Sequence, residues 1–348
     1  EDIEVIALFP AFDTTESLVS REHKKLAELP AGSIIGTSSP LRKKGLNELR
    51  PDLTIKGIRG CIEERVQQVK DGKYDAAIVA TCALKRLGME DEIAEVLPFP
   101  THPLQGFLAI TALKESQALQ QAFASKSILD KQGSVSLVGF GPGDPDLLTI
   151  KAAKAIDAAD IIFYDDLIDD SYLADKKAEK ICVGKRAGYH HKEQEDINRL
   201  LLNAAREGKN VVRLKGGDPM IFAHGSEEIE YLESNLIKVN VIPGITTASA
   251  LAASQKISLT HRDFSSSVAL VSGHTPQPVT PDAETLVYYM GAKQLQTIAT
   301  QLIDKEGWAF NTPVLLTYNV SRPDEQTFET TLWNLRNGEM QNLPTPLI

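Results

Sequence analysis

A glycine-rich turn over Gly139–Thr149, GFGPGDPDLLT, directly follows the apolar run VSLV and restricts what the chain can fold into. Such a turn leaves a strand and opens a helix, as in nucleotide-binding α/β proteins. The dinucleotide fingerprint is Gly-x-Gly-x-x-Gly, but Asp144 stands where the third glycine should be. A carboxylate there disfavours a pyrophosphate at the helix N-terminus. Asp144 followed by Pro145 is instead a good helix start, and the helix is predicted over about Pro145–Ala159.

Two other interpretations of this turn stay open on its own residues. An acidic residue, Asp165, follows the next predicted strand, so a nicotinamide cofactor is one alternative. The other alternative is a tight strand-to-helix connection that binds no ligand.

Strands alternate with helical patterns along the chain, which predicts the α/β fold class. In the front part IEVIALF, SIIGTS, TIKGIRG and DAAIVAT are predicted strands, with helices over Leu41–Leu49 and Ile62–Lys70. Residues 114–133 are polar and alanine-rich, and we interpret them as a helix and a linker. A second α/β pattern begins at Ser134 and changes texture after Pro243. The predicted domains are therefore 1–113, 134–243 and 244–348.

Composition excludes several classes of protein. With 37 basic and 47 acidic residues the net charge is −10, and neither half has the basic excess of a nucleic-acid binder. No apolar run approaches the ~18 residues that span a bilayer, so no membrane partner is expected. Cys61, Cys82 and Cys182 are far apart, which argues against disulfides or a zinc site and suits a reducing cytoplasm. The adjacent His190 and His191 are interpreted as polar loop residues, and no metal is expected.

Six motifs in the second part decide how the glycine turn is interpreted. They are GPGDPDLLT, GKRAGYHHKEQEDIN, VVRLKGGDP, PGITTASALAA, LTHRDFSSSVALVSGH and YYMG. Over about 135–348 they resemble, in the same order, the tetrapyrrole methylase family and within it uroporphyrinogen-III C-methyltransferase. Each motif alone is weak, but six in order are specific.

The resemblance implies two α/β lobes with S-adenosylmethionine bound in the cleft, and usually a cytoplasmic homodimer. This donor carries no phosphate, so the glycines of the turn would instead let the backbone approach it closely. Matching positions assign the donor pocket to Pro142, Gly216, Gly217, Asp218, Ile221, Thr246, Thr247 and Met290. From the residues alone, GGD can also be a plain turn at a strand end, and Met290 a core residue.

The implied reaction is methylation of two ring carbons of uroporphyrinogen III, which gives precorrin-2 and S-adenosylhomocysteine. Asp165 matches the family's base, and a carboxylate there could accept the proton that leaves the pyrrole. Lys185 matches the proton donor, and with Arg186 it could hold substrate carboxylates. The competing interpretations are that Asp165 caps a loop and that Lys185 is a solvated surface charge.

The chain departs from the family pattern in three places. His224 and Ser226 replace an arginine and a glycine, and Val320 replaces a glycine common near the donor. Asp166 stands beside Asp165, where the family has a basic residue. These changes bear on substrate affinity more than on the type of reaction.

The front part carries a second resemblance, to porphobilinogen deaminase (hydroxymethylbilane synthase), over roughly 3–113. It rests on LPAGSIIGTSSPLRKKGLNELRPDL, IRGCIEERV, DGKYDAAIVATCALKRLGM and LPFPTHPLQGFLAI. The implied fold is a periplasmic-binding-protein-like α/β domain. In that family, arginines hold the acetate and propionate groups of the growing pyrrole chain. The matching residues are Arg42, Arg59, Arg65 and Arg86, which from the residues alone can also be helix-surface arginines in salt bridges. The TSS before Leu41 and Arg42 looks like an anion-binding turn at a helix start.

Two features of the front part predict that it does not polymerise porphobilinogen by itself. Pro40 interrupts the arginine motif, and neither Cys61 nor Cys82 sits in the context that anchors the dipyrromethane cofactor. No dipyrromethane is therefore expected. The chain opens without methionine and stops at PTPLI, which looks like a strand cut short, so we expect a fragment.

Two alternatives to the leading function remain. One is a related methylase that acts on a later corrin precursor. The other is a non-catalytic protein that binds or channels pyrrole polycarboxylates through the arginines of the front part. The sequence does not distinguish sirohaem from cobalamin biosynthesis.

Overall fold

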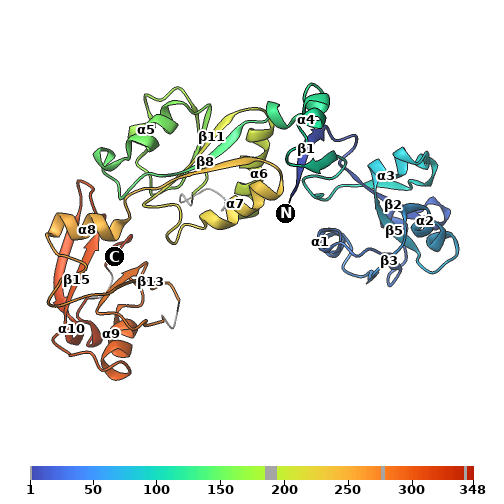
Figure 1. The fold of residues 1–348 in the computed structure, drawn as a ribbon. Coiled ribbons are helices and arrows are strands. Elements are labelled where there is room, and N and C mark those ends of the chain that lie inside the picture. The colour runs from blue at the N-terminus through green and yellow to red at the C-terminus, as the bar shows by residue number, and fades with distance from the viewer. Residues whose placement is uncertain (1, 185–193, 276–278, 341–342) are drawn as a thin grey trace. The chain divides into compact units, whose positions relative to one another are not determined.

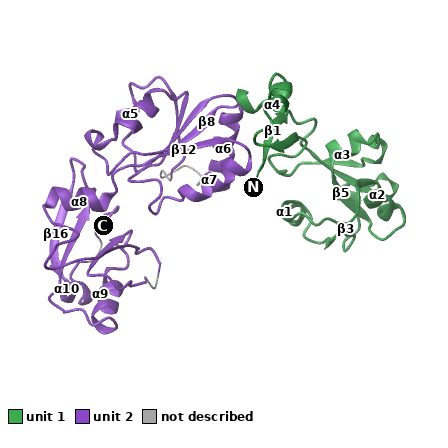
Figure 2. Cartoon of the chain, viewed as in Figure 1, with its two compact units in different colours: residues 1–131 green, residues 132–348 purple. Residues whose placement is uncertain are grey.

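The computed structural model describes residues 2–184, 194–275, 279–340 and 343–348. Contacts divide the chain into two compact units, residues 1–131 and 132–348, which Figure 2 shows in different colours. The predicted α/β class is confirmed in both units, each of which is described by itself below. The finer division into a linker over 114–133 and lobes over 134–243 and 244–348 stays a prediction.

Unit 1 is built around a mixed five-stranded sheet (Figure 1). Its strands, in order across the sheet, are β4 (Thr54–Lys56), β3 (Ile34–Gly36), β5 (Ala76–Ala80), β2 (Glu16–Ser20) and β6 (Glu95–Leu97). Strand β3 runs parallel to both of its neighbours, whereas β2 runs antiparallel to β5 and β6. Adjacent residues of β5 point to opposite faces. Ile78 therefore packs with Leu46 of α1 (Pro40–Leu49), and Val79 packs with Val66 of α2 (Ile62–Lys70).

The ends of unit 1 form an antiparallel ribbon of β1 (Ile3–Phe9) and β7 (Leu108–Leu113). Helix α4 (Gln117–Ala124) covers this ribbon, and the rings of Phe9 and Phe123 meet edge to face at 6.3 Å. Ser127 secures the connection, because its hydroxyl accepts a hydrogen bond from the Leu8 N–H at 3.1 Å. The remaining short helices of this unit are α3 (Thr81–Arg86) and the 3₁₀ turns η1 (Arg21–His23), η2 (Leu26–Glu28), η3 (Glu90–Glu92) and η4 (Leu129–Lys131).

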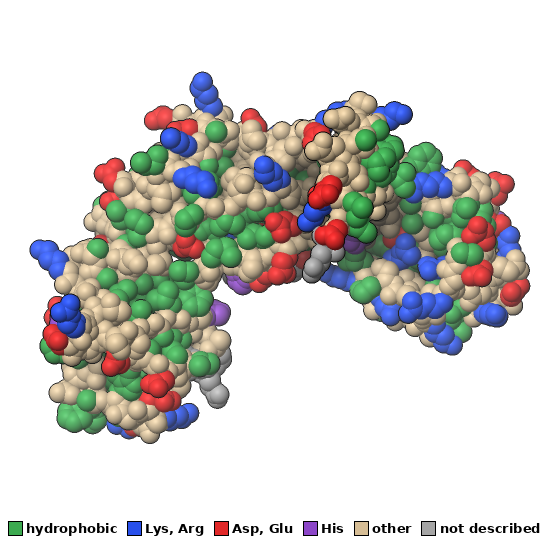
Figure 3. Space-filling view, viewed as in Figure 1, with side chains coloured by type: hydrophobic (Ala, Val, Ile, Leu, Met, Phe, Trp, Pro, Cys, Tyr) green, Lys and Arg blue, Asp and Glu red, His purple; other side chains and the backbone are tan. Residues whose placement is uncertain are grey.

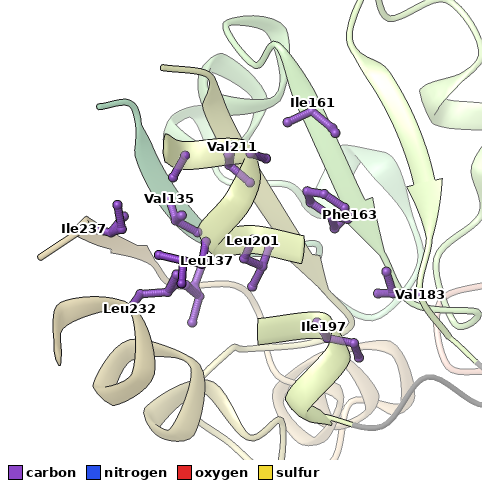
Figure 4. Close-up of a cluster of buried hydrophobic side chains, with 13 residues drawn as sticks. Val135, Leu137, Ile161, Phe163, Val183, Ile197, Leu201, Val211, Leu232 and Ile237 are labelled. Atoms are coloured by element: carbon purple, nitrogen blue, oxygen red, sulfur yellow. The ribbon is translucent and has the colours of Figure 1, made fainter. Parts of the chain in front are cut away.

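The first half of unit 2 is a fully parallel five-stranded sheet. The strand order is β10 (Glu179–Cys182), β9 (Ile161–Tyr164), β11 (Asn210–Lys215), β8 (Ser134–Gly139) and β12 (Lys238–Ile242). Both faces are covered, as in doubly wound α/β proteins. One face packs against α6 (Gln194–Arg206) and α7 (Gly225–Ser234), and Figure 4 shows Leu137, Leu201 and Leu232 within that cluster. The other face packs against α5 (Ile150–Asp157).

The helix predicted to begin at Pro145 begins later. Pro145–Leu147 forms only a 3₁₀ turn, η5, and α5 starts at Ile150. The reason is a second cap: the Asp144 carboxylate accepts a hydrogen bond from the Asp146 N–H, and the Thr149 hydroxyl then accepts one from the Ala152 N–H at 3.1 Å. A second 3₁₀ turn, η6 (Asp170–Leu173), follows β9.

Three glycines at the carboxyl ends of β8, β11 and β12 pack backbone against backbone. A Cβ atom on Gly139 would lie 2.5 Å from the Gly244 nitrogen, and one on Gly244 would lie 2.2 Å from the Gly217 carbonyl oxygen. Gly141 and Gly217 also exchange two backbone hydrogen bonds, of 3.1 and 2.7 Å. Only glycine lets the three turns approach this closely.

The second half of unit 2 contains two pairs of strands and three helices. β13 (Val268–Ser272) runs parallel to β14 (Thr285–Tyr289), and β15 (Pro313–Tyr318) runs antiparallel to β16 (Gln326–Thr331). The helices are α8 (Thr247–Gln255), α9 (Leu295–Asp304) and α10 (Leu332–Arg336). At the predicted strand PTPLI the structure shows an isolated antiparallel bridge, which pairs Leu347 with Tyr318. Ile348 and Thr317 exchange two backbone hydrogen bonds beside it.

We expect Gly244→Ala to destabilise unit 2 by about 2–3 kcal/mol, because the added methyl overlaps backbone that cannot move aside. Gly216→Ala is the matched control, since its Cβ would meet nothing closer than Leu167 Cβ at 3.8 Å. Both tryptophans, Trp308 and Trp333, lie in unit 2, so urea unfolding followed by tryptophan fluorescence reports on this unit. Equal unfolding midpoints for the two variants would contradict the expectation.

Candidate functional site

A cavity of about 470 Å³ lies in unit 2, between the carboxyl ends of the parallel sheet and the loops of the second half. Its volume lies in the range of roughly 300–1,000 Å³ that is usual for small-molecule sites. The wall includes the glycine turn after β8, the turn after β11, the start of α8, and the loops after β14 and β15.

All eight residues predicted to bind the donor line this cavity. They are Pro142, Gly216, Gly217, Asp218, Ile221, Thr246, Thr247 and Met290. They come from four segments that are far apart in the sequence, so the folding of both halves of unit 2 is needed to bring them together.

The GGD turn is held in a fixed conformation. Gly217 has a φ of +67°, which favours glycine. The Asp218 carboxylate accepts a hydrogen bond from the Met220 N–H at 2.8 Å and another from the Gly244 N–H at 3.0 Å. Asp218 therefore joins the ends of β11 and β12 at the cavity wall, which is more than a plain turn at a strand end requires.

The opposite wall is organised by Tyr289. Its hydroxyl lies 2.6 Å from the Thr246 hydroxyl and accepts a hydrogen bond from the Ala248 N–H at 3.2 Å. The Tyr289 ring also packs on Phe222, with ring centroids 5.2 Å apart. The next residue, Met290, has a positive φ of 59° and is 49 % exposed, so it is not a core methionine.

Buried charges beneath the site form a network centred on Arg213. Its guanidinium donates to Asp165 Oδ1 at 2.6 Å and to Glu228 Oε1 at 3.2 Å, and Lys215 Nζ lies 3.0 Å from the same Glu228 oxygen. The side chains of Arg213 and Glu228 are 3 % and 0 % exposed, whereas Asp165 is 32 % exposed. The network therefore extends from the buried side chains of Arg213 and Glu228 to the partly exposed carboxylate of Asp165.

The pKa values of the two cations move in opposite directions. Burial disfavours the charged form of Arg213, but the carboxylates of Asp165 and Glu228 outweigh it and raise the pKa of the guanidinium. Burial and the neighbouring Arg213 charge lower the pKa of Lys215. Arg213 is thus a fixed cation that orients the Asp165 carboxylate.

Of the two predicted catalytic residues, Asp165 lies within the described residues. Asp165 lies at the end of β9 but is not on the cavity wall, although Leu167, two residues later, is. Lys185 and Arg186 lie outside the described residues, as do His190 and His191.

The departures from the family pattern occupy three different environments. His224 precedes α7 with a φ of 54°, and its Nδ1 lies 2.9 Å from Glu227 Oε1 at the surface. Ser226 is an exposed residue in the first turn of that helix. Val320 is 3 % exposed and packs with Ala250 and Leu251, yet it also lines the cavity.

In unit 1, three of the four predicted substrate arginines have protein partners. Arg42 donates to Glu16 Oε1 at 2.7 Å and to the Ile78 carbonyl at 3.1 Å. Arg65 donates to the Gly60 carbonyl, and Arg86 donates to the Gly106 carbonyl. Arg59 is exposed. The predicted anion-binding turn before Arg42 instead caps α1, because the Ser39 hydroxyl faces the Arg42 N–H at 3.5 Å.

Sequence reasoning missed two parts of the site. One is the network of Arg213, Lys215 and Glu228. Two cations within the apolar part of the motif VVRLKGGDP were the sequence feature that pointed to it. The other is Arg322, which lines the cavity and donates to the Leu167 carbonyl. No motif pointed to Arg322.

Other classes of site have little support in the described structure. No described helix is both long and apolar enough to cross a bilayer. Within the ranges that the structure describes, no three His, Cys, Asp or Glu side chains are grouped to hold a metal ion. Figure 3 shows acidic and basic side chains interspersed over the visible face of unit 2.

Comparison with curated proteins finds relatives of the second unit. Siroheme synthases of Escherichia fergusonii and of Escherichia coli K12/DH10B are each 43 % identical over 230 residues, which is 63 % of this chain and 50 % of the relative. The chain therefore spans about half the length of the curated relatives it matches.

Solved structures give a consistent picture. Uroporphyrin-III C-methyltransferase from Thermus thermophilus is 37 % identical with a TM-score of 0.53, and the match covers 62 % of this chain and 90 % of that one. The same enzyme has been solved in complex with S-adenosylhomocysteine. A cobalamin biosynthetic enzyme, cobalt precorrin-4 methyltransferase, is 29 % identical with a TM-score of 0.52, covering 60 % and 91 %.

Two family models match the chain. The porphobilinogen deaminase model, described as its dipyrromethane cofactor binding domain, matches residues 1–121. The tetrapyrrole (corrin/porphyrin) methylase model matches residues 134–336, which is more than half of the chain. On this match, and with a cavity lined by both halves of unit 2, the chain belongs to the tetrapyrrole methylase family.

Proposed function

We propose that this chain transfers two methyl groups from S-adenosylmethionine to ring carbons of uroporphyrinogen III, giving precorrin-2 for sirohaem or cobalamin biosynthesis. The observation that carries the proposal is that all eight residues assigned to the donor by the motifs line one and the same cavity. The similarity to siroheme synthases and to a uroporphyrin-III C-methyltransferase supports the same substrate.

The residues of the cavity fit such a donor. A Cβ on Gly216 would meet only Leu167 at 3.8 Å, and one on Gly217 only Thr247 at 4.0 Å, so the backbone of this turn is open to the cavity. Carboxylate, hydroxyl and amide side chains of Asp218, Thr246 and Asn319 are among the polar groups of the wall and supply partners for the donor. When bound, the donor supplies a sulfonium methyl group, whose carbon–sulfur bond breaks as the new carbon–carbon bond forms, and the pyrrole then loses one proton.

Asp165 is our proposal for the group that accepts this proton. Its carboxylate is held by Arg213 on one side and is partly open to solvent on the other, so it is both oriented and accessible. A fixed carboxylate also stabilises the positive charge that develops on the pyrrole. Lys185 and Arg186 remain proposed as proton donor and substrate ligand.

We propose further that the methylase part forms a homodimer and works in the cytoplasm, on the strength of the family resemblance. A second candidate function is methylation of a later corrin precursor, which the similarity to cobalt precorrin-4 methyltransferase favours. The lower identity of that match ranks it second.

Anaerobic incubation of the chain with S-adenosylmethionine and uroporphyrinogen III should give a product with two added methyl groups, read by mass spectrometry. The two-methyl product distinguishes the leading proposal from the later-precursor alternative. Absence of any methylated uroporphyrinogen III in the presence of active donor would reject the leading proposal.

Asp165→Asn should lower kcat by roughly 10²- to 10⁴-fold, the usual contribution of a general base. Donor binding should change little, because Asp165 is not on the cavity wall. Asp157→Asn is the matched control, since that carboxylate lies at the end of α5 and pairs with Lys176 at 2.7 Å. Turnover and equilibrium binding of S-adenosylhomocysteine are measured for both. Equal turnover in the two variants would remove Asp165 from the mechanism.

We propose that unit 1 has no deaminase activity in this chain. Arg42 supports this, because its pairing with the buried Glu16 competes with a substrate carboxylate. Incubation with porphobilinogen should give no hydroxymethylbilane above background, measured as uroporphyrin I after oxidation. An authentic porphobilinogen deaminase serves as the positive control, and product formed by this chain would refute the proposal.

A further inference from the structure

Arg322 connects the two halves of unit 2 beside the donor cavity. It lies in the loop between β15 and β16, and its guanidinium donates to the main-chain carbonyl of Leu167, in the loop after β9. Both residues line the cavity. Arg322 thus spans the wall of the cavity and ends two residues away from Asp165.

The loop that carries Arg322 is held in a fixed shape. Asn319 and Ser321 have positive φ values of 48° and 61°, which non-glycine residues adopt only where the surroundings impose them. Glu325 imposes it here: its carboxylate accepts hydrogen bonds from the Ser321 N–H at 2.6 Å and from the Gln255 side chain at 3.1 Å. The Asn319 amide also donates to Asp324 at 2.8 Å. The stem of Arg322 therefore starts from a preorganised position.

The glycine turn leaves room for that stem. A Cβ on Gly143 would lie 2.8 Å from Cγ and 2.9 Å from Nε of Arg322. Gly143 also has a φ of 144°, so the turn passes beneath the arginine without a side chain. The turn of the first half and the loop of the second half are thus fitted to each other at this residue.

The far end of Arg322 acts on a turn that contains Asp165. The Ile168 N–H donates to the Asp165 carbonyl at 3.0 Å, which closes a four-residue turn with Leu167 in its third position. Arg213 holds the side chain of Asp165, the first residue of this turn. The guanidinium of Arg322 ties the turn to the second half of the unit.

We propose that Arg322 is a positioning residue, which holds the Asp165–Ile168 turn against the donor cavity and so sets where Asp165 stands relative to the donor methyl group. This inference rests on the proposed methyltransferase function. Arg322 acts through the Leu167 carbonyl and is not assigned a contact with either substrate.

The test compares Arg322→Ala and Arg322→Lys with the control Arg336→Ala, which removes a surface arginine paired with Asp304 at 2.9 Å. Arg322→Ala should lower kcat by roughly tenfold to a hundredfold, as expected for misplacement of a catalytic group by about 1 Å. The KM for S-adenosylmethionine should change by less than about threefold, because the lost interaction is not a uniform binding contact. Arg322→Lys keeps one donor for the carbonyl and should recover most of kcat, and the control should match the wild type.

Hydrogen exchange gives a second reading that does not depend on turnover. Amides in the peptide covering residues 161–170 should exchange faster in Arg322→Ala than in Arg336→Ala. A raised donor KM with unchanged kcat would make Arg322 a donor-binding residue and overturn the proposal, as would unchanged exchange in this peptide. If the wild type methylates nothing, the proposed function fails, while the exchange result still decides whether Arg322 holds the turn.

Discussion

Backbone packed against backbone at Gly139, Gly217 and Gly244 is the constraint on which the methylase unit depends. These glycines stand at the ends of three adjacent strands of one sheet, and Gly139 and Gly244 have no space for even a single methyl group. The strand ends therefore lie closer together than larger residues would allow. The loops that leave this point have to turn outward, and the cavity exists because they do.

Much of the fold follows from local pattern. The buried strands β5 and β9 are short apolar runs, and the predicted helix over Ile62–Lys70 has the bounds that the structure shows. The eight donor-site residues came from the family resemblance, and they line one cavity because most of them follow the carboxyl ends of parallel strands. The carboxyl ends of parallel strands meet at one edge of a sheet, so residues that follow such strands converge.

Other features depend on partners that local pattern does not reveal. β2, β6, β10 and β16 have no clear apolar alternation, and they are strands because a neighbour pairs with them. Arg42 follows a plausible anion-binding turn, yet its partner is Glu16, far earlier in the chain. Arg322 sits in a polar loop whose importance comes entirely from a carbonyl contributed by the other half of the unit. Long-range pairing decided each of these cases.

The buried ion pairs between β11 and α7 also hold one side of the cavity in place. Arg213 and Lys215 lie on the central strand β11, and their buried counter-ion, Glu228, lies on α7. Lifting α7 away would remove the buried carboxylate that pairs with Lys215 and one of the two that pair with Arg213, which is strongly unfavourable. The segment before α7 contributes Ile221 and Ala223 to the cavity wall, and the buried ion pairs therefore hold this part of the wall in place.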